Sequence, residues 1–418
     1  LCFQSKNLYN RVNYNIRQSY FYGCGVPSYT QLCNWFKKTD TYCALPAKVS
    51  QLVIKQLSEA WSAYFQAIVS YQENPEKFTG FPSIPGYKEP LKGRNLLKYN
   101  YQAISKNALK KGYIQLSKTK IKLPFKVKDH QIIEVRLVPK KARYYILEVV
   151  YDDRELPPEF SFKPVRIASL DLGLDNLATI AFNIPSVQPI IINGKPIKSI
   201  NQRWNKQVAH FRSLLPDGQT SSKRIDNLTR RRNCSIENYL HHASSSIVEQ
   251  LREREIELLI IGKNEQWKTS LNLGKRNNQN FVFIPSEKFI HLVTYKCQAA
   301  GIEVRVVEES YTSKASFLDG DNIPTYSPQQ KNKPTFSGIR IRRAWYRAAD
   351  GRLIHADVNG AYNIGRKVIP SAYLELLNML ARDRGCLVVH PRRITPFPYE
   401  NRHKRRKRSK PANEWARV

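Results

Sequence analysis

The sequence predicts an α/β protein with several domains, and three observations support this prediction. A chain of 418 residues is longer than one hydrophobic core usually serves, which indicates two or three domains. Short apolar strands alternate with helical patterns after residue 166, which favours a mixed sheet covered by helices. Before residue 153 the pattern changes from helical spacing to β alternation, so we expect a helical part and a β-rich part before the sheet.

The first 95 residues are predicted to be mostly helical. Apolar residues recur at helical spacing over residues 49–69, which indicates a long amphipathic helix. Residues 75–95 are rich in proline, glycine and lysine, and this composition predicts a linker or an irregular basic loop. Lys88 and Arg94 in this loop are candidates for contact with the phosphates of a nucleic acid.

Residues 96–158 are predicted to form a small basic β-barrel that ends in a linker. Apolar and polar residues alternate in three runs, as expected for strands with one buried face. Three lysines recur at even spacing and would share one face of an extended segment, which makes them nucleic-acid candidates: Lys118, Lys120 and Lys122.

The mixed sheet is expected from residue 159 onward. Three strands are predicted in succession at 166–171, 177–182 and 188–193, and further strands are expected at 257–262 and 302–308. A basic helical insertion at about 201–255 separates the two groups of strands. A solvated charged face would give the same pattern there, but a surface for nucleic acid is an equal alternative, with these candidates: Lys223, Arg224, Arg230, Arg231 and Arg232.

The charge of the chain indicates a nucleic-acid partner. Lysine and arginine number 68 against 34 acids, which gives a net charge of +34. The last nineteen residues hold eight basic and two acidic residues, so most of the excess belongs to the body of the chain. Such charge binds phosphate through counterion release. An anionic membrane surface is the alternative, but we find no amphipathic anchor and no apolar run long enough to span a bilayer.

The seven cysteines indicate a reducing compartment. Their number is odd and they contain no Cys-x-x-Cys pair, so we expect a cytoplasmic protein with free thiols. The chain begins at Leu1 rather than at a methionine, and we therefore expect further residues before it.

Two acids stand at the ends of predicted elements. Asp171 ends a buried strand, and Gly173 permits a tight turn after it. A carboxylate at such a place costs desolvation energy unless a cation compensates it, and a metal ion does so in phosphoryl chemistry. An ordinary hairpin turn is the alternative for Asp171. Asp357 begins a predicted helix, where an N-terminal cap is the alternative.

Three motifs lie in order across roughly residues 160–370: Asp171-Leu-Gly-Leu-Asp-Asn-Leu-Ala-Thr, Tyr311-Thr-Ser-Lys, and Ala356-Asp-Val-Asn-Gly-Ala-Tyr-Asn-Ile. This ordered set resembles the RuvC-like nuclease domain of transposon-encoded TnpB proteins, which are compact relatives of type V CRISPR effectors and of the eukaryotic Fanzor proteins. The resemblance implies an RNase H-like (RuvC) mixed sheet with helices. It also implies a prokaryotic protein associated with the nucleoid.

The domain organisation follows from the composition and the resemblance together. Residues 1–95 correspond to a helical recognition lobe and residues 96–158 to the β-barrel wedge domain. Residues 159–370 correspond to the nuclease domain with its helical insertion. The remaining residues, 371–418, are expected to form a basic and disordered tail.

The resemblance implies an RNA-guided DNA endonuclease, with a structured guide RNA and target double-stranded DNA beside a short adjacent motif as its partners. A guided DNA-binding protein that does not cleave is one alternative. A transposase or resolvase that acts without RNA is another, but a resolvase would need only the nuclease fold and not the long part before it.

Cleavage in this family implies two Mg²⁺ or Mn²⁺ ions held by three carboxylates, of which Asp171 and Asp357 would be two. In most relatives the third is a glutamate at the end of the strand that matches 257–262, but here that strand ends in Gly262. We expect Glu309 to replace it as catalytic residue and metal ligand, because certain Fanzor proteins look rearranged in this way.

Two other glutamates are alternatives for the third acid. Glu308 is the neighbour of Glu309, and since successive side chains of a strand point to opposite faces, only one of the two can reach the site. Glu265 follows the strand that ends at Gly262, in a polar turn where exposure is expected. If no glutamate reaches the site, the nuclease is impaired.

Many relatives bind zinc through two cysteine pairs before the last aspartate. Residues 314–356 contain no cysteine, so we predict no zinc in this chain. Three arginines beside Trp345 and Tyr346 form a basic and aromatic patch that is predicted to guide single-stranded DNA: Arg340, Arg342 and Arg343.

Overall fold

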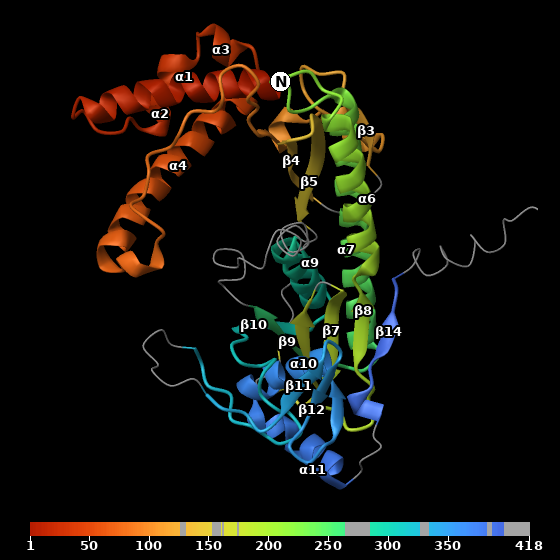
Figure 1. The fold of residues 1–418 in the computed structure, drawn as a ribbon. Helices are drawn as coiled ribbons and strands as arrows, with labels where there is room; N and C mark the ends of the chain where they lie inside the picture. The colour runs from red at the N-terminus through yellow and green to blue at the C-terminus, as the bar shows by residue number, and fades with distance from the viewer. Residues whose placement is uncertain are drawn as a thin grey trace, which may run out of the picture. The chain divides into compact units, whose positions relative to one another are not determined.

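The structure of the chain is a computed structural model, and it divides into two compact units, Leu1–Leu156 and Pro157–Val418 (Figure 1). It describes residues 1–125, 131–152, 160, 163–173, 175–263, 285–326, 334–382 and 387–396. Among these residues no helix is both long enough and apolar enough to cross a membrane.

The first unit begins with helices, as predicted. Their bounds are α1 (Cys2–Phe21), α2 (Tyr29–Phe36), α3 (Asp40–Cys43), α4 (Ala47–Glu73) and the short 3-10 helix η1 (Pro75–Lys77). The long amphipathic helix is α4, and its buried Trp61 donates a hydrogen bond from Nε1 to Oδ1 of Asn13 in α1 at 3.0 Å. The loop after η1 is fixed to α1, since Asn13 also donates from Nδ2 to the carbonyl oxygen of Pro85 at 2.9 Å.

The β-rich part of the first unit consists of open sheets. One sheet has the antiparallel order β1-β4-β5, and β2 and β3 form a separate hairpin. The elements are β1 (Leu97–Asn100), η2 (Tyr101–Ala103), α5 (Lys106–Lys110), β2 (Tyr113–Gln115), β3 (Lys122–Pro124), β4 (Gln131–Lys140) and β5 (Tyr144–Asp152). These described strands do not close on one another, so the predicted barrel is not confirmed. The sheet shares one hydrophobic core with α1 and α4, and the predicted boundary between residues 95 and 96 lies inside this unit.

The second unit is built on a six-stranded mixed sheet in the order β10-β9-β6-β7-β8-β14. The antiparallel meander of β6 (Ile167–Leu172), β7 (Asn176–Phe182) and β8 (Ile190–Asn193) confirms the three predicted strands. The strands β9 (Leu258–Lys263) and β10 (Glu303–Glu308) continue the sheet in parallel beyond β6. The apolar run of β6 is buried on both faces, which is what its sequence predicted.

Helices cover both faces of this sheet. Ala168 and Leu170 of β6 pack in one core with α7 (Lys223–Arg252) and α9 (Ser286–Ala299). Ile167 points to the opposite face, where it packs against Ile364 of α10 (Ala356–Val368). Because side chains alternate along a strand, Asp171 shares the face of Ile167 and therefore points toward α10.

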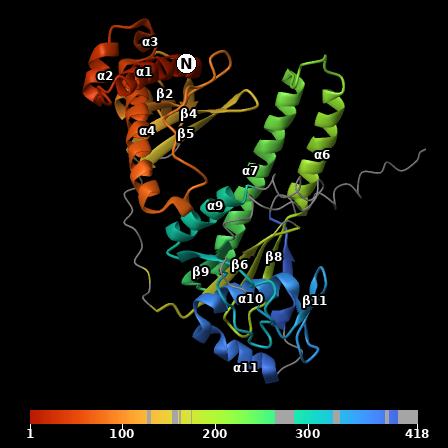
Figure 2. The ribbon, with the colours of Figure 1, turned by 60° about the vertical axis from the view of Figure 1, so that its left-hand side comes forward.

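The predicted helical insertion is a hairpin of α6 (Lys195–Arg212) and α7, between β8 and β9. Figure 2 shows the two helices side by side, extending beyond the sheet. Cation–π contacts are among those that hold the hairpin: Arg224 stacks over Phe211 at 4.1 Å, and Arg232 stacks over Trp204 at 5.2 Å.

A small antiparallel sheet precedes α10. It consists of β11 (Ile339–Arg342), β12 (Trp345–Arg347) and β13 (Leu353–His355), and β13 leads directly into α10. The exposed β11 carries arginines of the predicted basic patch, whereas Tyr346 of β12 is buried.

The prediction of a disordered tail from residue 371 is wrong for its first part. Residues 370–396 hold η3 (Pro370–Tyr373), α11 (Leu374–Arg382), η4 (Leu387–Val389) and β14 (Arg392–Ile394). Leu376 and Leu380 of α11 are buried in the core beside α10, and β14 pairs in parallel with β8. The basic residues that suggested a tail gather after residue 400, outside the described residues, while the earlier residues have the apolar spacing of a packed helix.

Candidate active site

Asp171 lies at the end of β6 against α10. The backbones approach closely there, because a Cβ atom on Gly360 of α10 would lie only 3.0 Å from Oδ2 of Asp171. Burial raises the pKa of Asp171 well above its usual range, and the charges of Glu309 and Asp357 raise it further against the opposing charge of Arg340. Glu309 and Asp357 therefore lie near enough to Asp171 to disfavour its charged form.

Asp357 lies in the first turn of α10 but does not cap it. The cap is His355, whose Nδ1 accepts a hydrogen bond from the backbone N–H of Asp357 at 3.3 Å, so the capping interpretation of Asp357 is wrong. The carboxylate of Asp357 accepts a hydrogen bond on Oδ2 from Nδ2 of Asn176 at 2.6 Å. The guanidinium of Arg340 lies 3.7 Å from its Oδ1. Asp357 is thus an oriented carboxylate that faces a cation.

Glu309 follows the last residue of β10 and turns inward. Its Oε2 atom is buried and has no hydrogen-bond partner among the described residues. Burial and the charge of Glu308 raise the pKa of Glu309 to about 7, against the opposing charge of Lys367. A buried carboxylate oxygen without a partner is costly, which is the condition under which a cation is bound favourably.

Glu308 points away from Glu309, and both of its carboxylate oxygens have partners. It forms an ion pair with Nζ of Lys367 at 2.7 Å and accepts hydrogen bonds from the backbone N–H of Ser310 at 2.6 Å and from the hydroxyl of Ser310. Partial burial opposes ionisation, but the contacts with Lys367 and Ser310 outweigh it and lower the pKa of Glu308. The alternative Glu265 lies outside the described residues.

The types of residue fit a hard divalent cation. Carboxylate oxygens are the ligands that Mg²⁺ and Mn²⁺ prefer, and the orphaned Oε2 of Glu309 needs a positive partner. Within the described part of the chain, however, no three histidine, cysteine, aspartate or glutamate side chains are gathered closely enough to hold one ion between them. The arrangement is therefore a set of neighbouring acids from three elements rather than a closed cage.

The β11–β12 hairpin is tied to the same end of the sheet. Arg343 forms an ion pair with Oδ2 of Asp175 at 2.5 Å, and Lys198 of α6 contacts Oδ1 of the same carboxylate at 2.9 Å. Arg342 is exposed on β11. The sequence reasoning found the three arginines of the patch but missed Asp175 and Asn176, although both belong to the motif that begins at Asp171.

The other predicted nucleic-acid residues are dispersed over the two units. On the helical hairpin, Lys223, Arg230 and Arg231 are exposed. Arg232, by contrast, donates from Nε to Oδ1 of Asn201 at 2.8 Å and stacks on α6, so it also has a structural role. These side chains supply positive charge at several separate places. The described residues do not establish one continuous basic surface.

In the first unit, three predicted basic residues stack on aromatic rings: Lys88 over Tyr9 at 4.9 Å, Arg94 over Phe3 at 4.9 Å and Lys122 over Tyr113 at 4.3 Å. Lys118 and Lys120 lie in the turn before β3, and Lys118 has a positive φ of 53°. The predicted extended face of three lysines is therefore wrong, because only Lys122 lies in a strand.

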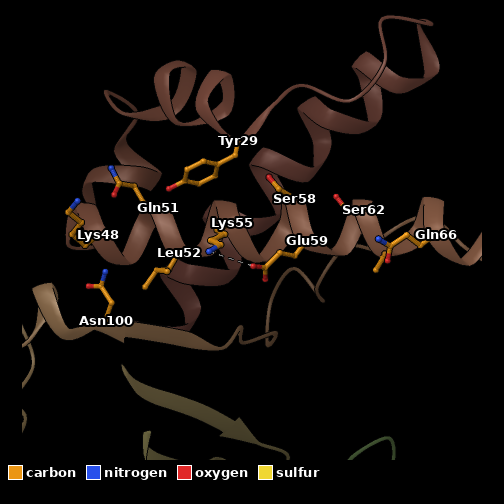
Figure 3. Close-up of a pocket in the computed structure, with 11 residues that line it drawn as sticks. Tyr29, Lys48, Gln51, Leu52, Lys55, Ser58, Glu59, Ser62, Gln66 and Asn100 are labelled. Carbon is orange, nitrogen blue, oxygen red and sulfur yellow. Dashed lines mark ion pairs between the residues drawn. The ribbon is translucent and has the colours of Figure 1, made fainter. Parts of the chain in front are cut away.

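The first unit also has an open groove of about 720 Å³ along α4 (Figure 3). Its floor is one polar face of the helix, where Lys55 and Glu59 form an exposed ion pair at 4.0 Å, and Tyr29 and Asn100 flank it. The groove contains none of the three acids. Its mixed and exposed charges give it no chemistry of its own.

The region that holds cysteine pairs in many relatives is held here by side-chain hydrogen bonds. Oδ2 of Asp321 accepts from the backbone N–H groups of Ser316 at 2.7 Å and Ser337 at 3.1 Å. Asn359 of α10 accepts from the N–H of Phe317 at 2.9 Å. The hydroxyl of Tyr346 donates to the carbonyl oxygen of Lys314 at 2.7 Å. These bonds hold the segment after Glu309 together, and the bond from Phe317 to Asn359 ties it to α10.

Parts of the chain are similar to known proteins. Residues 151–268 match a family model described as a probable transposase, OrfB_IS605, and residues 287–364 match the Cas12f1-like TNB domain. The TnpB-like protein ORF457 of Acidianus two-tailed virus is 21% identical over 437 residues, which cover 94% of this chain and 87% of the viral protein. Over these segments the chain is similar to TnpB-type and Cas12f-related proteins.

The candidate acids lie inside the matched segments, with Asp171 in the first and Glu309 and Asp357 in the second. Among solved structures, a Cas12f1–sgRNA–target DNA complex has a TM-score of 0.47 and 14% identity, over 86% of this chain and 80% of that chain. A CRISPR-Cas12f ternary complex has a TM-score of 0.34 and 13% identity, over 86% and 79% of the two chains.

Proposed function

We propose that this chain is an RNA-guided DNA endonuclease that hydrolyses phosphodiester bonds at Asp171, Glu309 and Asp357. One observation carries the proposal: Asp171, at the end of a central strand, faces acids from two other elements, and Glu309 among them has a buried oxygen without a described partner. Such a set of acids destabilises the protein unless a cation binds to it. The similarity to TnpB-type and Cas12f-related proteins supports the same reaction.

The three carboxylates would hold the two Mg²⁺ or Mn²⁺ ions of the reaction. When bound, such ions activate the attacking water and stabilise the leaving oxygen. Asn176 orients the carboxylate of Asp357 through its hydrogen bond to Oδ2. Glu309, with a pKa of about 7, holds a proton in part of the molecules at neutral pH and releases it when a cation takes its place. Arg340, beside Asp357, is available to bind the phosphate of the strand to be cut.

Guide RNA and target DNA are the proposed partners. The net charge of +34 supports binding to a long polyanion, and the exposed arginines of the helical hairpin and of β11 supply part of that charge. In guided nucleases the RNA selects the sequence by pairing, while the protein reads a short motif next to the target. Positive charge that is spread over the whole chain suits a protein that binds the backbones of both the guide RNA and the target DNA.

A guided DNA-binding protein without cleavage is the second candidate. It is favoured by the observation that no three described acids gather around a single point. A transposase or resolvase that acts without RNA is less well supported, because the first unit of residues 1–156 would then have no task.

Purification in high salt tests the guided function. We expect a structured RNA to remain bound, which absorbance at 260 nm detects and sequencing identifies. Protein reconstituted with that RNA should cut a matched plasmid in Mg²⁺ and not in EDTA. A stable, monodisperse protein free of nucleic acid would contradict the proposed RNA-guided function. A complex that binds the target but does not cut it would establish the second candidate instead.

A further inference from the structure

Gly262 lies at the centre of the strand ends that carry the acids. It pairs with Val307 of β10 on one side, and Ile261 before it pairs with Leu170 of β6 on the other. Position 262 is therefore level with Asp171 in β6 and with Val307 in β10, two residues before Glu309. A side chain at this position would stand between the two acids.

The space of that absent side chain is occupied by Glu309. A Cβ atom on Gly262 would lie 2.8 Å from Oε2 of Glu309, closer than carbon and oxygen atoms approach without a bond. It would also meet Cδ1 of Ile364 of α10, and Cγ1 of the same side chain at 3.0 Å, and because Ile364 is fully buried, the added methyl group collides with both side chains. The carboxylate of Glu309 thus fits against the backbone of β9 only because residue 262 is glycine.

A second contact determines which glutamate turns inward. Glu308 is held outward by Nζ of Lys367, which also donates to the carbonyl oxygen of Ser310 at 3.3 Å. The Lys367 side chain is 11% exposed and that of Glu308 38%, so the ion pair is shielded from solvent on the lysine side only. With Glu308 fixed in this way, the alternation of the strand directs Glu309 to the face of Asp171.

We propose that Gly262 and Lys367 are the positioning residues of Glu309: the glycine leaves the volume that the carboxylate occupies, and the lysine holds Glu308 away from it. This inference rests on the proposed function, since it assigns the two residues to the same reaction. Neither residue touches the reacting atoms, and both act through Glu309.

A double-mutant cycle in EDTA tests the role of Gly262 without any activity. Gly262→Ala should lower the midpoint of thermal unfolding by on the order of 5 °C, because the added methyl group overpacks the site. In a Glu309→Ala background the same substitution should cost measurably less, since the collision with the carboxylate is gone and only the one with Ile364 remains. An equal loss in both backgrounds would overturn the proposal and leave Ile364 as the cause.

Cleavage and cation binding test the consequence for the site. Gly262→Ala should lower the single-turnover cleavage rate by at least tenfold, with target affinity within about twofold of wild type. It should also weaken the binding of Mn²⁺ alone, measured from the free-ion signal in paramagnetic resonance. Gly80→Ala is the matched control, because a Cβ atom there meets nothing within 4 Å. Wild-type cleavage in Gly262→Ala would contradict the proposal.

Lys367 is tested by rescue. Lys367→Met should reduce the cleavage rate, because the unpaired Glu308 then competes with Glu309, whereas Lys367→Arg should retain most of it. Adding Glu308→Gln to Lys367→Met should restore activity in part, since the competing charge is removed. A lysine with only a structural role predicts no such recovery, and that result would overturn its assignment.

Different results would contradict the proposed endonuclease and the proposed positioning of Glu309. If wild type does not cut DNA under any condition, the proposed endonuclease is wrong, yet the unfolding cycle still decides whether Glu309 occupies the volume at Gly262. If wild type cuts and the cycle shows no coupling, the endonuclease stands and the positioning proposal is wrong.

Discussion

Asn176 donates a hydrogen bond from Nδ2 to Oδ2 of Asp357 at 2.6 Å and so joins the start of β7 to the first turn of α10. This bond fixes one of the three acids relative to the sheet that carries Asp171. The site is therefore assembled by the packing of α10 on the sheet and not by a single loop.

Asp171→Ala and Asp357→Ala should each abolish guided cleavage and leave target binding nearly unchanged. Each removes a cation ligand and not a contact with phosphate, so the rate should fall by several orders of magnitude. Cleavage and filter binding are measured on the same reconstituted complex. If target binding falls as far as cleavage, the two acids have a structural role, and their position at the end of the sheet does not serve cleavage.

Asp175→Asn should loosen the β11–β12 hairpin and α6 together, because the carboxylate pairs with both Arg343 and Lys198. Partial burial works against ionisation, but the hydrogen bond from Lys198 and the charge of Arg343 lower the pKa of Asp175 below 3.8. A carboxyl group whose pKa is lower in the folded protein than in the unfolded chain adds stability above its unfolded-state pKa. That stability is lost as the pH falls through the folded-state pKa. The difference in unfolding midpoint between variant and wild type should thus be constant above pH ~5 and should shrink below pH ~4. A difference that does not change with pH would show that the charge is not the cause.

Asp321→Ala should destabilise the segment between Glu309 and α10. It leaves the buried N–H of Ser316 and the N–H of Ser337 without their acceptor, which costs about 1–3 kcal/mol. Asp321→Asn keeps one acceptor oxygen and should retain much of the stability. Denaturant unfolding of wild type, Asp321→Asn and Asp321→Ala measures the order of their stabilities. Equal stability of Asp321→Ala and wild type would mean that the hydrogen bonds do not hold this region.

Zinc should be absent from the purified protein. Residues 314–356 contain no cysteine, and the described part of this segment is held by hydrogen bonds and by the buried rings of Phe317 and Tyr346. Elemental analysis is the measurement, with a protein of known zinc content as the standard. About one zinc ion per chain would contradict the prediction.

The strands and two of the acids could be predicted because their signals are local. The apolar run before Asp171 is a strand by its own composition, and the residues after Asp357 have helical spacing by themselves. The sequence also predicted that only one of Glu308 and Glu309 reaches the site. The resemblance favoured Glu309, but the contact that separates the two glutamates involves Lys367, which is distant in sequence and reaches Glu308 only through the packing of α10.

Long-range pairing also explains the errors. Nothing in residues 392–394 alone indicates that they extend the sheet beside β8, and the nearby basic residues favoured a tail instead. The barrel was inferred from alternation, which indicates strands but not how they close. Gly262 marked a departure from the resemblance in the sequence, but its purpose depends on where the carboxylate of Glu309 lies in space.

The central claim is that Glu309 supplies the third acid, and one comparison tests it most directly. Glu309→Gln, Glu308→Gln and Glu265→Gln are measured on one plasmid target with saturating guide RNA and Mg²⁺. Glu309→Gln should lose cleavage by orders of magnitude, because a neutral amide binds a divalent cation far less well than a carboxylate does. Glu308→Gln should be intermediate at most, and Glu265→Gln should remain near wild type. Loss of cleavage in Glu265→Gln with activity retained in Glu309→Gln would contradict the account.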